Sequence, residues 1–117
     1  DNVNGIIFNV ACVTEAPGVD ELLEKFIARW GYDPSIDAAP DCYMACDAFK
    51  LLTGAIEKAG STDSVAIRDA LETTKDLQGL TCTITIDPAT HNVYRQVPIY
   101  QIVDGEFKQL ELYDLHA

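Results

Sequence analysis

The four cysteines have the most varied potential chemistry in this chain. Cys42 and Cys46 lie four residues apart, on one face if the segment is helical, and a metal-binding pair also uses that spacing. No Cys-x-x-Cys pair or clustered histidine completes such a site, so we expect no metal and no cofactor. With Cys12 and Cys82, the even count permits two disulfides in three connectivities. We favour buried thiols that fill apolar space over metal or redox chemistry.

The two histidines give no sign of a catalytic site. His91 and His116 are distant in sequence, one in a turn and the other near the end of the chain. The residues Asp-Pro-Ala-Thr-His-Asn at 87–92 place three reactive types together, but this composition is typical of a turn between strands. No nucleophile elbow, phosphate-binding loop or pair of carboxylates is present. The sequence therefore predicts no catalytic residue and no enzyme.

The charge balance excludes some partners. The 117 residues include 19 acidic and 8 basic side chains, for a formal net charge of −11. Nucleic acid and anionic membrane surfaces would repel such a chain, and the acidity is best explained by solubility. The longest apolar stretch, residues 5–13, is too short for a membrane span, and no signal peptide is visible. An exported mature protein, a fragment and a cytosolic protein are all compatible with these features.

The first two predicted elements are a strand and a helix. Residues 5–13 (GIIFNVACV) form an almost continuous apolar run, which is typical of a parallel strand covered on both faces. From Val19 the apolar residues recur with helical spacing up to Trp30. Gly31 is expected to end this helix, and Pro34 prevents it from resuming.

Two further helices follow. Residues 41–58 are nearly all small or apolar, which predicts a helix buried on most sides and closed by Gly60. Thr62 or Asp63 is expected to cap a third helix over about 63–73 by accepting hydrogen bonds from its free N–H groups.

The C-terminal part has the pattern of strands. Residues 81–87 alternate and are β-branched, 93–103 form a second strand, and 106–115 a third. The Asp-Gly pair at 104–105 predicts a tight hairpin between the last two. The predicted order is β-α-α-α-β-β-β in a single α/β domain.

Ligands of open α/β sheets bind beyond the carboxyl ends of the strands. For the first strand these positions are Thr14 and Glu15, and the start of the second helix places Asp41 and Tyr43 nearby. Thr14 is suited to hydrogen-bond a ligand carboxylate or ammonium group, and Tyr43 to pack on an apolar side chain. We therefore take Thr14, Glu15, Asp41 and Tyr43 as candidate ligand-binding residues. The alternatives are ordinary loop roles for Thr14 and Glu15 and core packing for Tyr43. The residue types favour these alternatives over ligand binding.

Several motifs resemble one family. They are Cys46-Asp47-Ala48, KAGSTD at 58–63, AIRDAL at 66–71, Gly79 to Cys82, Ile86-Asp87, and DGEF at 104–107. In this combination the chain resembles the C-terminal part of type I periplasmic binding proteins, in the branch of branched-chain amino acid ABC transporters. Cys46 and Cys82 stand where that family usually has Tyr and Gly. A bond between these two thiols is conceivable if their segments touch, but unpaired buried thiols are favoured.

The resemblance implies a three-layer αβα fold with a C-terminal antiparallel hairpin. Family members have two lobes with a ligand cleft between them. Residues 1–117 would supply the C-terminal part of lobe I and the hinge-proximal strands as one domain fragment. The implied function is capture of a small solute, such as a branched-chain or other amino acid, for an ABC permease. The implied location is periplasmic or extracellular, either lipid-anchored or soluble in the intact protein.

Such a fragment has consequences for binding and association. Residues 5–13 would expose apolar surface in isolation, so we expect a homo-oligomer or strand-swapped dimer. We also expect no measurable amino-acid affinity for the isolated chain. A ligand-sensing domain of the same fold and a cysteine-dependent redox protein or enzyme are the alternative functions.

Overall fold

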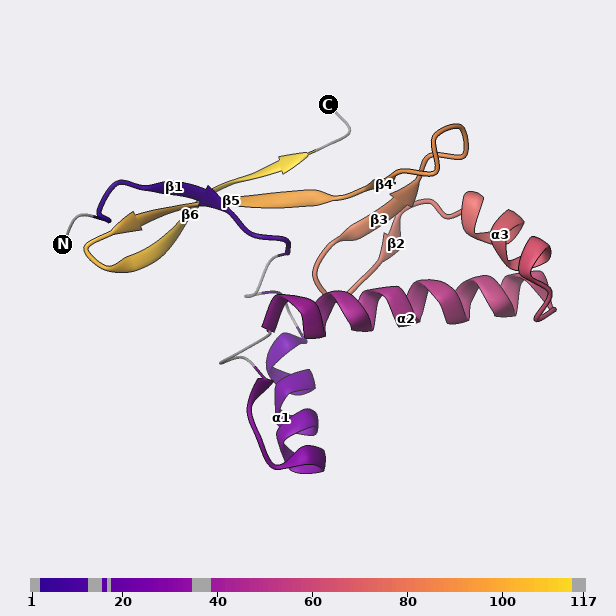
Figure 1. Ribbon diagram of the computed structural model, residues 1–117, viewed down its shortest axis with the longest axis horizontal. Coiled ribbons are helices and arrows are strands. Elements are labelled where there is room, and N and C mark those ends of the chain that lie inside the picture. Colours follow the sequence, from indigo (N-terminus) through magenta and orange to yellow (C-terminus); the bar gives the residue numbers. More distant parts are fainter. Residues whose placement is uncertain (1–2, 13–15, 17, 35–38, 115–117) are drawn as a thin grey trace.

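A computed structural model describes residues 3–12, 16, 18–34 and 39–114. Three helices and six strands follow one another as β1 (Ile7–Asn9), α1 (Val19–Trp30), α2 (Ala39–Ala59), α3 (Ser64–Glu72), β2 (Leu77–Gln78), β3 (Thr83–Ile86), β4 (Val93–Tyr94), β5 (Gln96–Val103) and β6 (Glu106–Asp114). The strands form two small sheets of order β1-β5-β6 and β2-β3-β4. Figure 1 shows α2 running below the second sheet, while the first sheet projects away from the helices.

The helices begin and end close to the positions that the sequence predicts. Gly31 ends α1 with a φ of 76° and donates its N–H to the carbonyl of Ile27 at 2.8 Å. Such a left-handed conformation suits glycine because it has no Cβ. Asp63 caps α3, since its carboxylate accepts hydrogen bonds from the N–H groups of Val65 and Ala66 at 3.0 and 3.1 Å. Within the described residues, no helix combines the length and apolar character needed to cross a bilayer.

Sheet β1-β5-β6 is antiparallel throughout. Strand β1 pairs with β5 from Ile7 opposite Gln101 to Asn9 opposite Ile99. Strands β5 and β6 form the predicted hairpin, in which Asp104 and Gly105 both have positive φ angles of 54° and 84°. Two positive φ values are typical of the turn that matches the twist of paired strands. The hairpin at 104–105 is therefore confirmed.

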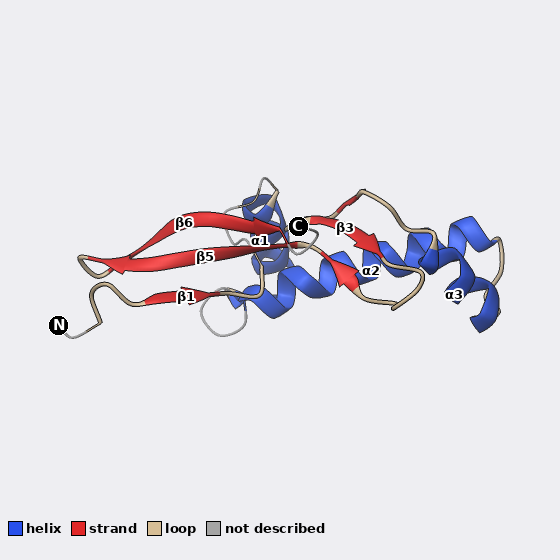
Figure 2. Ribbon diagram, turned by 90° about the horizontal axis from the view of Figure 1, so that it is seen from above, coloured by secondary structure: helices blue, strands red, loops and turns tan. Residues whose placement is uncertain are grey.

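The prediction for the first strand is wrong in its length, in its direction relative to the neighbouring strand and in the burial of its side chains. Residues 5–13 were expected to form a parallel strand covered on both faces, but the strand is only Ile7–Asn9, it is antiparallel to β5, and 60% of Ile7 is exposed. Apolar composition alone does not specify the partner strand, whose paired residues lie 90 or more positions away along the chain. Two small antiparallel sheets thus replace the expected three-layer αβα arrangement (Figure 2).

Two other expectations also need correction. Helix α2 is not buried on most sides, because 70% of Phe49 and 45% of Leu52 are exposed. The strand expected over 93–103 is divided at Arg95 into β4 and β5, which belong to different sheets. The segment around Arg95 therefore connects the two sheets.

A small apolar core lies where α1, α2 and the N-terminal segment meet. Cys12, Val19 and Tyr43 are buried there, with exposed fractions of 3% or less. Partly buried apolar side chains pack around them, including Leu22, Leu23, Met44 and Leu80. This core anchors the first half of α2 against the loop that enters β3.

Candidate functional site

A carboxylate on α2 holds the loop between β2 and β3. Asp47 is 5% exposed, and it accepts hydrogen bonds from the N–H of Leu80, from the N–H of Thr81 at 3.1 Å and from Thr81 Oγ1 at 2.6 Å. Hydrogen bonds to an ionised acceptor are stronger than those between neutral groups. Together these bonds fix the loop at 79–82 against the helix, and we call this contact the Asp47 latch.

Glycine makes the latch geometrically feasible. A Cβ at Gly79 would lie 2.6 Å from Asp47 Oδ1 and 2.8 Å from the carbonyl oxygen of Cys82. The N–H of Gly79 also donates to that carbonyl at 2.9 Å, which closes the loop. Beside it, the ammonium group of Lys50 donates to the carbonyl of Gln78. The helix is therefore attached to the loop through two side chains, one acidic and one basic.

A hollow of about 340 Å³ lies next to the latch. It is bounded by α2 on one side and by β3 and β4 on the other, with lining residues Met44, Asp47, Ala48, Leu51, Cys82, Ile84, Val93 and Arg95. Most of these side chains are apolar, and Arg95 supplies a positive charge in the segment that connects the sheets. The lining thus combines apolar walls with one guanidinium group and with the Asp47 carboxylate, which is already bonded to the loop at 79–82.

Three of the four thiols lack the lowered pKa that is typical of a cysteine nucleophile. Burial raises the pKa of the Cys12, Cys46 and Cys82 thiols above the ordinary value. The thiolate is the reactive form, so a raised pKa reduces the reactive fraction at neutral pH. No disulfide joins any of the four cysteines, including the pair Cys46 and Cys82. This environment argues against a nucleophilic role for Cys12, Cys46 and Cys82.

Thiol reactivity tests this interpretation. We expect the buried Cys12 to react with Ellman's reagent at pH 7 more slowly in the native chain than in the urea-unfolded chain, and the half-buried Cys46 and Cys82 to be slowed less, because burial raises the pKa of all three thiols. The rate should rise with pH, because a larger fraction of each thiol is then ionised. A thiol that reacts faster in the native chain than in urea at pH 7 would contradict the prediction and favour redox chemistry.

The four candidate ligand-binding residues predicted from the sequence do not form one site in the described structure. Thr14 and Glu15 lie outside the described residues. Asp41 is exposed in the first turn of α2. Tyr43 is 2% exposed and packs in the core with Cys12 and Val19, and its phenol pKa is raised by burial. Core packing is thus its observed contact, and ligand binding by these residues stays a prediction.

The sequence interpretation overlooked Asp47 and Arg95 as site residues. In the sequence, Asp47 is noted only as part of the motif Cys46-Asp47-Ala48. An acidic residue among apolar helix residues is nevertheless a signal, because a buried carboxylate needs hydrogen-bond donors. Its donors are backbone N–H groups more than 30 residues away, which no local pattern reveals. Arg95 is a single charge within an apolar run, and no local pattern indicates that it lies beside the hollow.

The histidine in the turn has a structural contact. His91 lies in the turn at 87–92, and its Nε2 atom is 3.2 Å from Oε1 of Glu72 on α3. Both side chains are at least partly exposed. In that turn Asp87 accepts hydrogen bonds from the N–H of Ala89 and from the hydroxyls of Thr90 and Tyr94, and these bonds lower the pKa of its carboxyl group. The turn connects β3 and β4, as the sequence predicts. His116 lies outside the described residues.

Metal binding has no support in the described parts of the chain. Residues 3–12, 16, 18–34 and 39–114 contain no group of three or more His, Cys, Asp or Glu side chains arranged to hold a metal ion.

Comparison with known proteins identifies the fold. No protein-family model and no curated protein matches the chain. Its structure is similar to a leucine-binding protein of Thermotoga maritima, with a TM-score of 0.71 and 24% identity over 99% of this chain and 33% of that one. It is also similar to the structure of a branched-chain amino acid ABC transporter protein from Rhodospirillum rubrum. That match has a TM-score of 0.70 and 24% identity, and it covers 92% of this chain and 31% of that one. The chain thus spans about a third of these structures and has the fold of part of a type I periplasmic binding protein.

Proposed function

We propose that this chain is part of an extracytoplasmic solute-binding protein that captures an amino acid, preferably an aliphatic one, and delivers it to an ABC permease. The observation that carries the proposal is the structural likeness over 99% of this chain to a leucine-binding protein. A second solved structure, assigned to branched-chain amino acid transport, supports the same class of ligand. On this proposal residues 1–117 form the C-terminal part of lobe I and the hinge-proximal strands, in a protein of the periplasm or cell exterior.

The mechanism would be closure around a ligand without any covalent step. In the described chain, the segment at Arg95 connects the sheet β1-β5-β6 to the sheet β2-β3-β4. Small changes of backbone angle in such connections allow two rigid parts to close. The exposed carboxylate of Asp41 is suited to an ammonium group, and Asp41 stays one of the four candidate ligand-binding residues.

Calorimetry tests this proposal. The natural polypeptide that carries this sequence should bind leucine, isoleucine or valine with a Kd in the micromolar range or tighter, whereas glutamate and lysine should give no heat. Absence of binding to any amino acid would overturn the proposal. For the 117-residue chain alone we expect no measurable affinity, because it spans only about a third of the similar structures.

A matched pair of variants tests the role of Asp41. If Asp41 binds the ligand ammonium group, Asp41→Ala in the natural polypeptide should weaken binding at least about tenfold, since a lost charged hydrogen bond costs about 1.5–3 kcal/mol. Asp69→Ala removes another exposed carboxylate, on α3, and should leave affinity unchanged. Equal affinity of both variants would remove Asp41 from the site.

A further inference from the structure

Asn4 is followed by glycine, whereas the three other asparagines of the chain, Asn2, Asn9 and Asn92, are followed by valine. A backbone nitrogen can attack the side-chain amide of an asparagine that precedes it, because the cyclic imide that forms is small and unstrained. Glycine has no side chain to shield its nitrogen, whereas the branched side chain of valine does shield it. Asn4 therefore has the sequence context in this chain that most favours the reaction.

The fold engages both reacting groups of this pair. The N–H of Gly5 donates to the carbonyl of Ile102 in β5 at 2.8 Å. Asn4 Oδ1 accepts a hydrogen bond from the N–H of Asp104, in the turn of the hairpin β5-β6, at 2.9 Å. We call these two contacts the Asn4 clip. The clip holds the Gly5 nitrogen in a bond to β5, so this nitrogen must be released before it can attack the Asn4 side chain.

The clip depends on a short strand at the edge of its sheet. Strand β1 follows Asn4 and Gly5 directly, and only Ile7–Asn9 pair with β5. Its Phe8 ring stacks on Tyr100 with ring centres 5.9 Å apart and contacts the edge of Phe107 at 5.2 Å. An edge strand with so few pairs can open while the rest of the chain stays folded. Each opening of β1 frees the Gly5 nitrogen and the Asn4 side chain.

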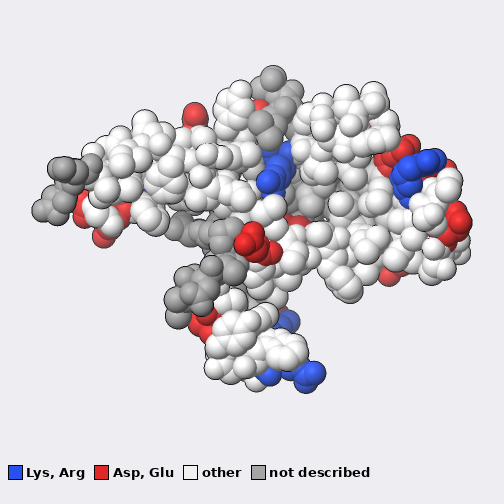
Figure 3. Space-filling view, viewed as in Figure 1, with Lys and Arg blue, Asp and Glu red and all other residues white. Residues whose placement is uncertain are grey.

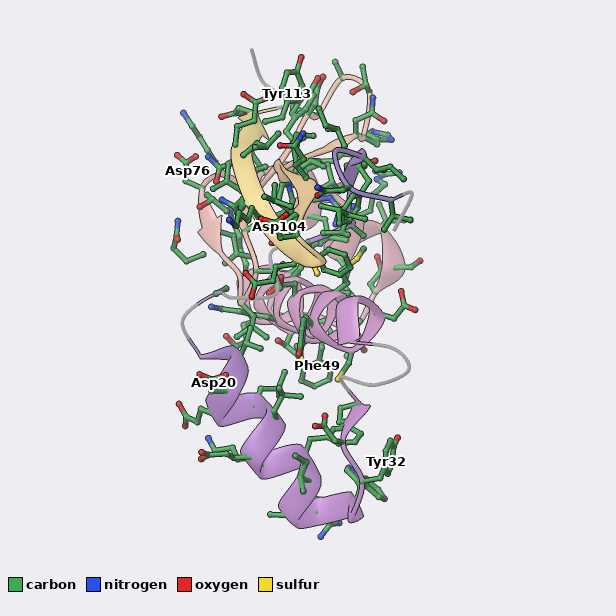
Figure 4. The ribbon with its side chains drawn as sticks, turned by 90° about the vertical axis from the view of Figure 1, so that its left-hand side faces the viewer. Asp20, Tyr32, Phe49, Asp76, Asp104 and Tyr113 are labelled. Carbon is green, nitrogen blue, oxygen red and sulfur yellow. The ribbon has the colours of Figure 1, made fainter. Side chains whose placement is uncertain are left out.

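Water, the second reactant, has access to this place in the chain. Asn4 and Gly5 are exposed. With Val3, Asp104 and Gly105, Asn4 lies at a hollow of about 380 Å³. Figure 4 is viewed from the turn end of the hairpin and shows Asp104 in that turn. Opening of β1, and not the supply of water, therefore limits the reaction.

We propose that Asn4 is a site of spontaneous deamidation and that the opening of β1 controls its rate. The Gly5 nitrogen forms a bond to Cγ of Asn4, and the bond from Cγ to the side-chain nitrogen breaks. The proton of the Gly5 amide leaves with that nitrogen as ammonia. Water then opens the cyclic imide at either of its carbonyl carbons, which gives aspartate or isoaspartate. The proposal rests on the Asn4 clip and is independent of the proposed transport function.

The products attach β1 less well than the original chain. Isoaspartate inserts a methylene group into the main chain before Gly5, so the clip and the pairing of Ile7 with Gln101 can no longer form together. Both products also add a carboxylate to a chain of net charge −11. They add it at the turn end of the sheet, where Figure 3 shows acidic side chains on the visible face. The modification therefore loosens β1 irreversibly.

Peptide mass spectrometry of the purified 117-residue chain at mildly alkaline pH tests the proposal. In urea, Asn4 should lose its amide faster than Asn9 and Asn92. In the native chain Asn4 should react more slowly than in urea by at least about fivefold, the factor for an opening free energy of about 1 kcal/mol. Hydrogen exchange of the Gly5 amide should be slowed by a similar factor, because both reactions pass through the same opened state.

A matched pair of variants tests the control by β1. Phe8→Ala removes the ring contacts of β1, so it should accelerate deamidation of Asn4 in the native chain at least about threefold. It should leave the rate in urea unchanged. Phe49→Ala removes a ring that is 70% exposed on α2 and that Figure 4 shows apart from Asp104, so it should change neither rate.

Each contrary outcome overturns a stated part of the proposal. If Asn4 keeps its amide in both the native and the unfolded chain, it is not a modification site. Equal rates in the native chain and in urea would show that the fold does not control the reaction. Should Phe8→Ala speed up exchange of the Gly5 amide without speeding up deamidation, opening of β1 is not the controlling step. The comparison with urea uses the unaltered chain, so it does not depend on the folding of any variant.

Discussion

Replacing Asp47 by alanine should lower the free energy of unfolding by about 3 kcal/mol. The change removes a buried acceptor and leaves the N–H groups of Leu80 and Thr81 without their hydrogen bonds, and each such loss costs about 1–3 kcal/mol. Because small domains have only about 5–15 kcal/mol of stability, a change of this size is large. Urea unfolding followed by circular dichroism measures it.

Two further variants make the Asp47 prediction specific. Thr81→Val removes only the hydroxyl donor at 2.6 Å and should cost about 1 kcal/mol. Asp69→Ala removes an exposed carboxylate on α3 and should change stability by less than about 0.5 kcal/mol. If Asp47→Ala and Asp69→Ala cost the same, the latch does not stabilise the fold.

Substitution of Gly79 by alanine should destabilise the chain by about 2–3 kcal/mol. The new Cβ would lie 2.6 Å from Asp47 Oδ1 and 2.8 Å from the Cys82 carbonyl oxygen, and the backbone atom has little freedom to move away. Forcing atoms into an occupied space typically costs about 1–3 kcal/mol. The same urea titration measures this effect.

Gly54→Ala is the matched control for this prediction, and it should have the opposite sign. Gly54 lies within α2, and nothing lies within 4 Å of a Cβ built there. Alanine in a helix interior is more favourable than glycine by about 0.5–1 kcal/mol, so Gly54→Ala should stabilise the chain. In the Asp47→Ala background Gly79→Ala should cost less, because one of the two clashes is gone. A stabilising Gly79→Ala would contradict the geometry of the loop.

The sequence predicts the features that depend on local chemistry. Helical spacing and the positions of Gly31 and Asp63 indicate α1 and α3 nearly to the residue, because capping and backbone conformation are set by immediate neighbours. The Asp-Gly turn at 104–105 is predicted for the same reason. These features need no knowledge of the rest of the fold.

Features that depend on distant partners were not predictable in this way. An apolar run indicates that a segment will be buried, but it does not specify which segment packs over it or whether that segment belongs to the same chain. Ile7 is apolar and is nevertheless exposed. The expected strand over 81–87 begins only at Thr83, since Asp47 holds Thr81 in the loop. Cys82 and Arg95 meet across the hollow through tertiary packing, and no spacing rule connects them.

The placement of β1 also has a consequence for the order of folding. Helices α2 and α3 and the hairpin β5-β6 form between residues close in sequence, whereas Ile7 must find Gln101 across almost the entire chain. Contacts that close long loops form late because they carry the largest entropy cost. With only three residues paired, β1 should therefore join the native structure last and be the first strand whose amides exchange with solvent.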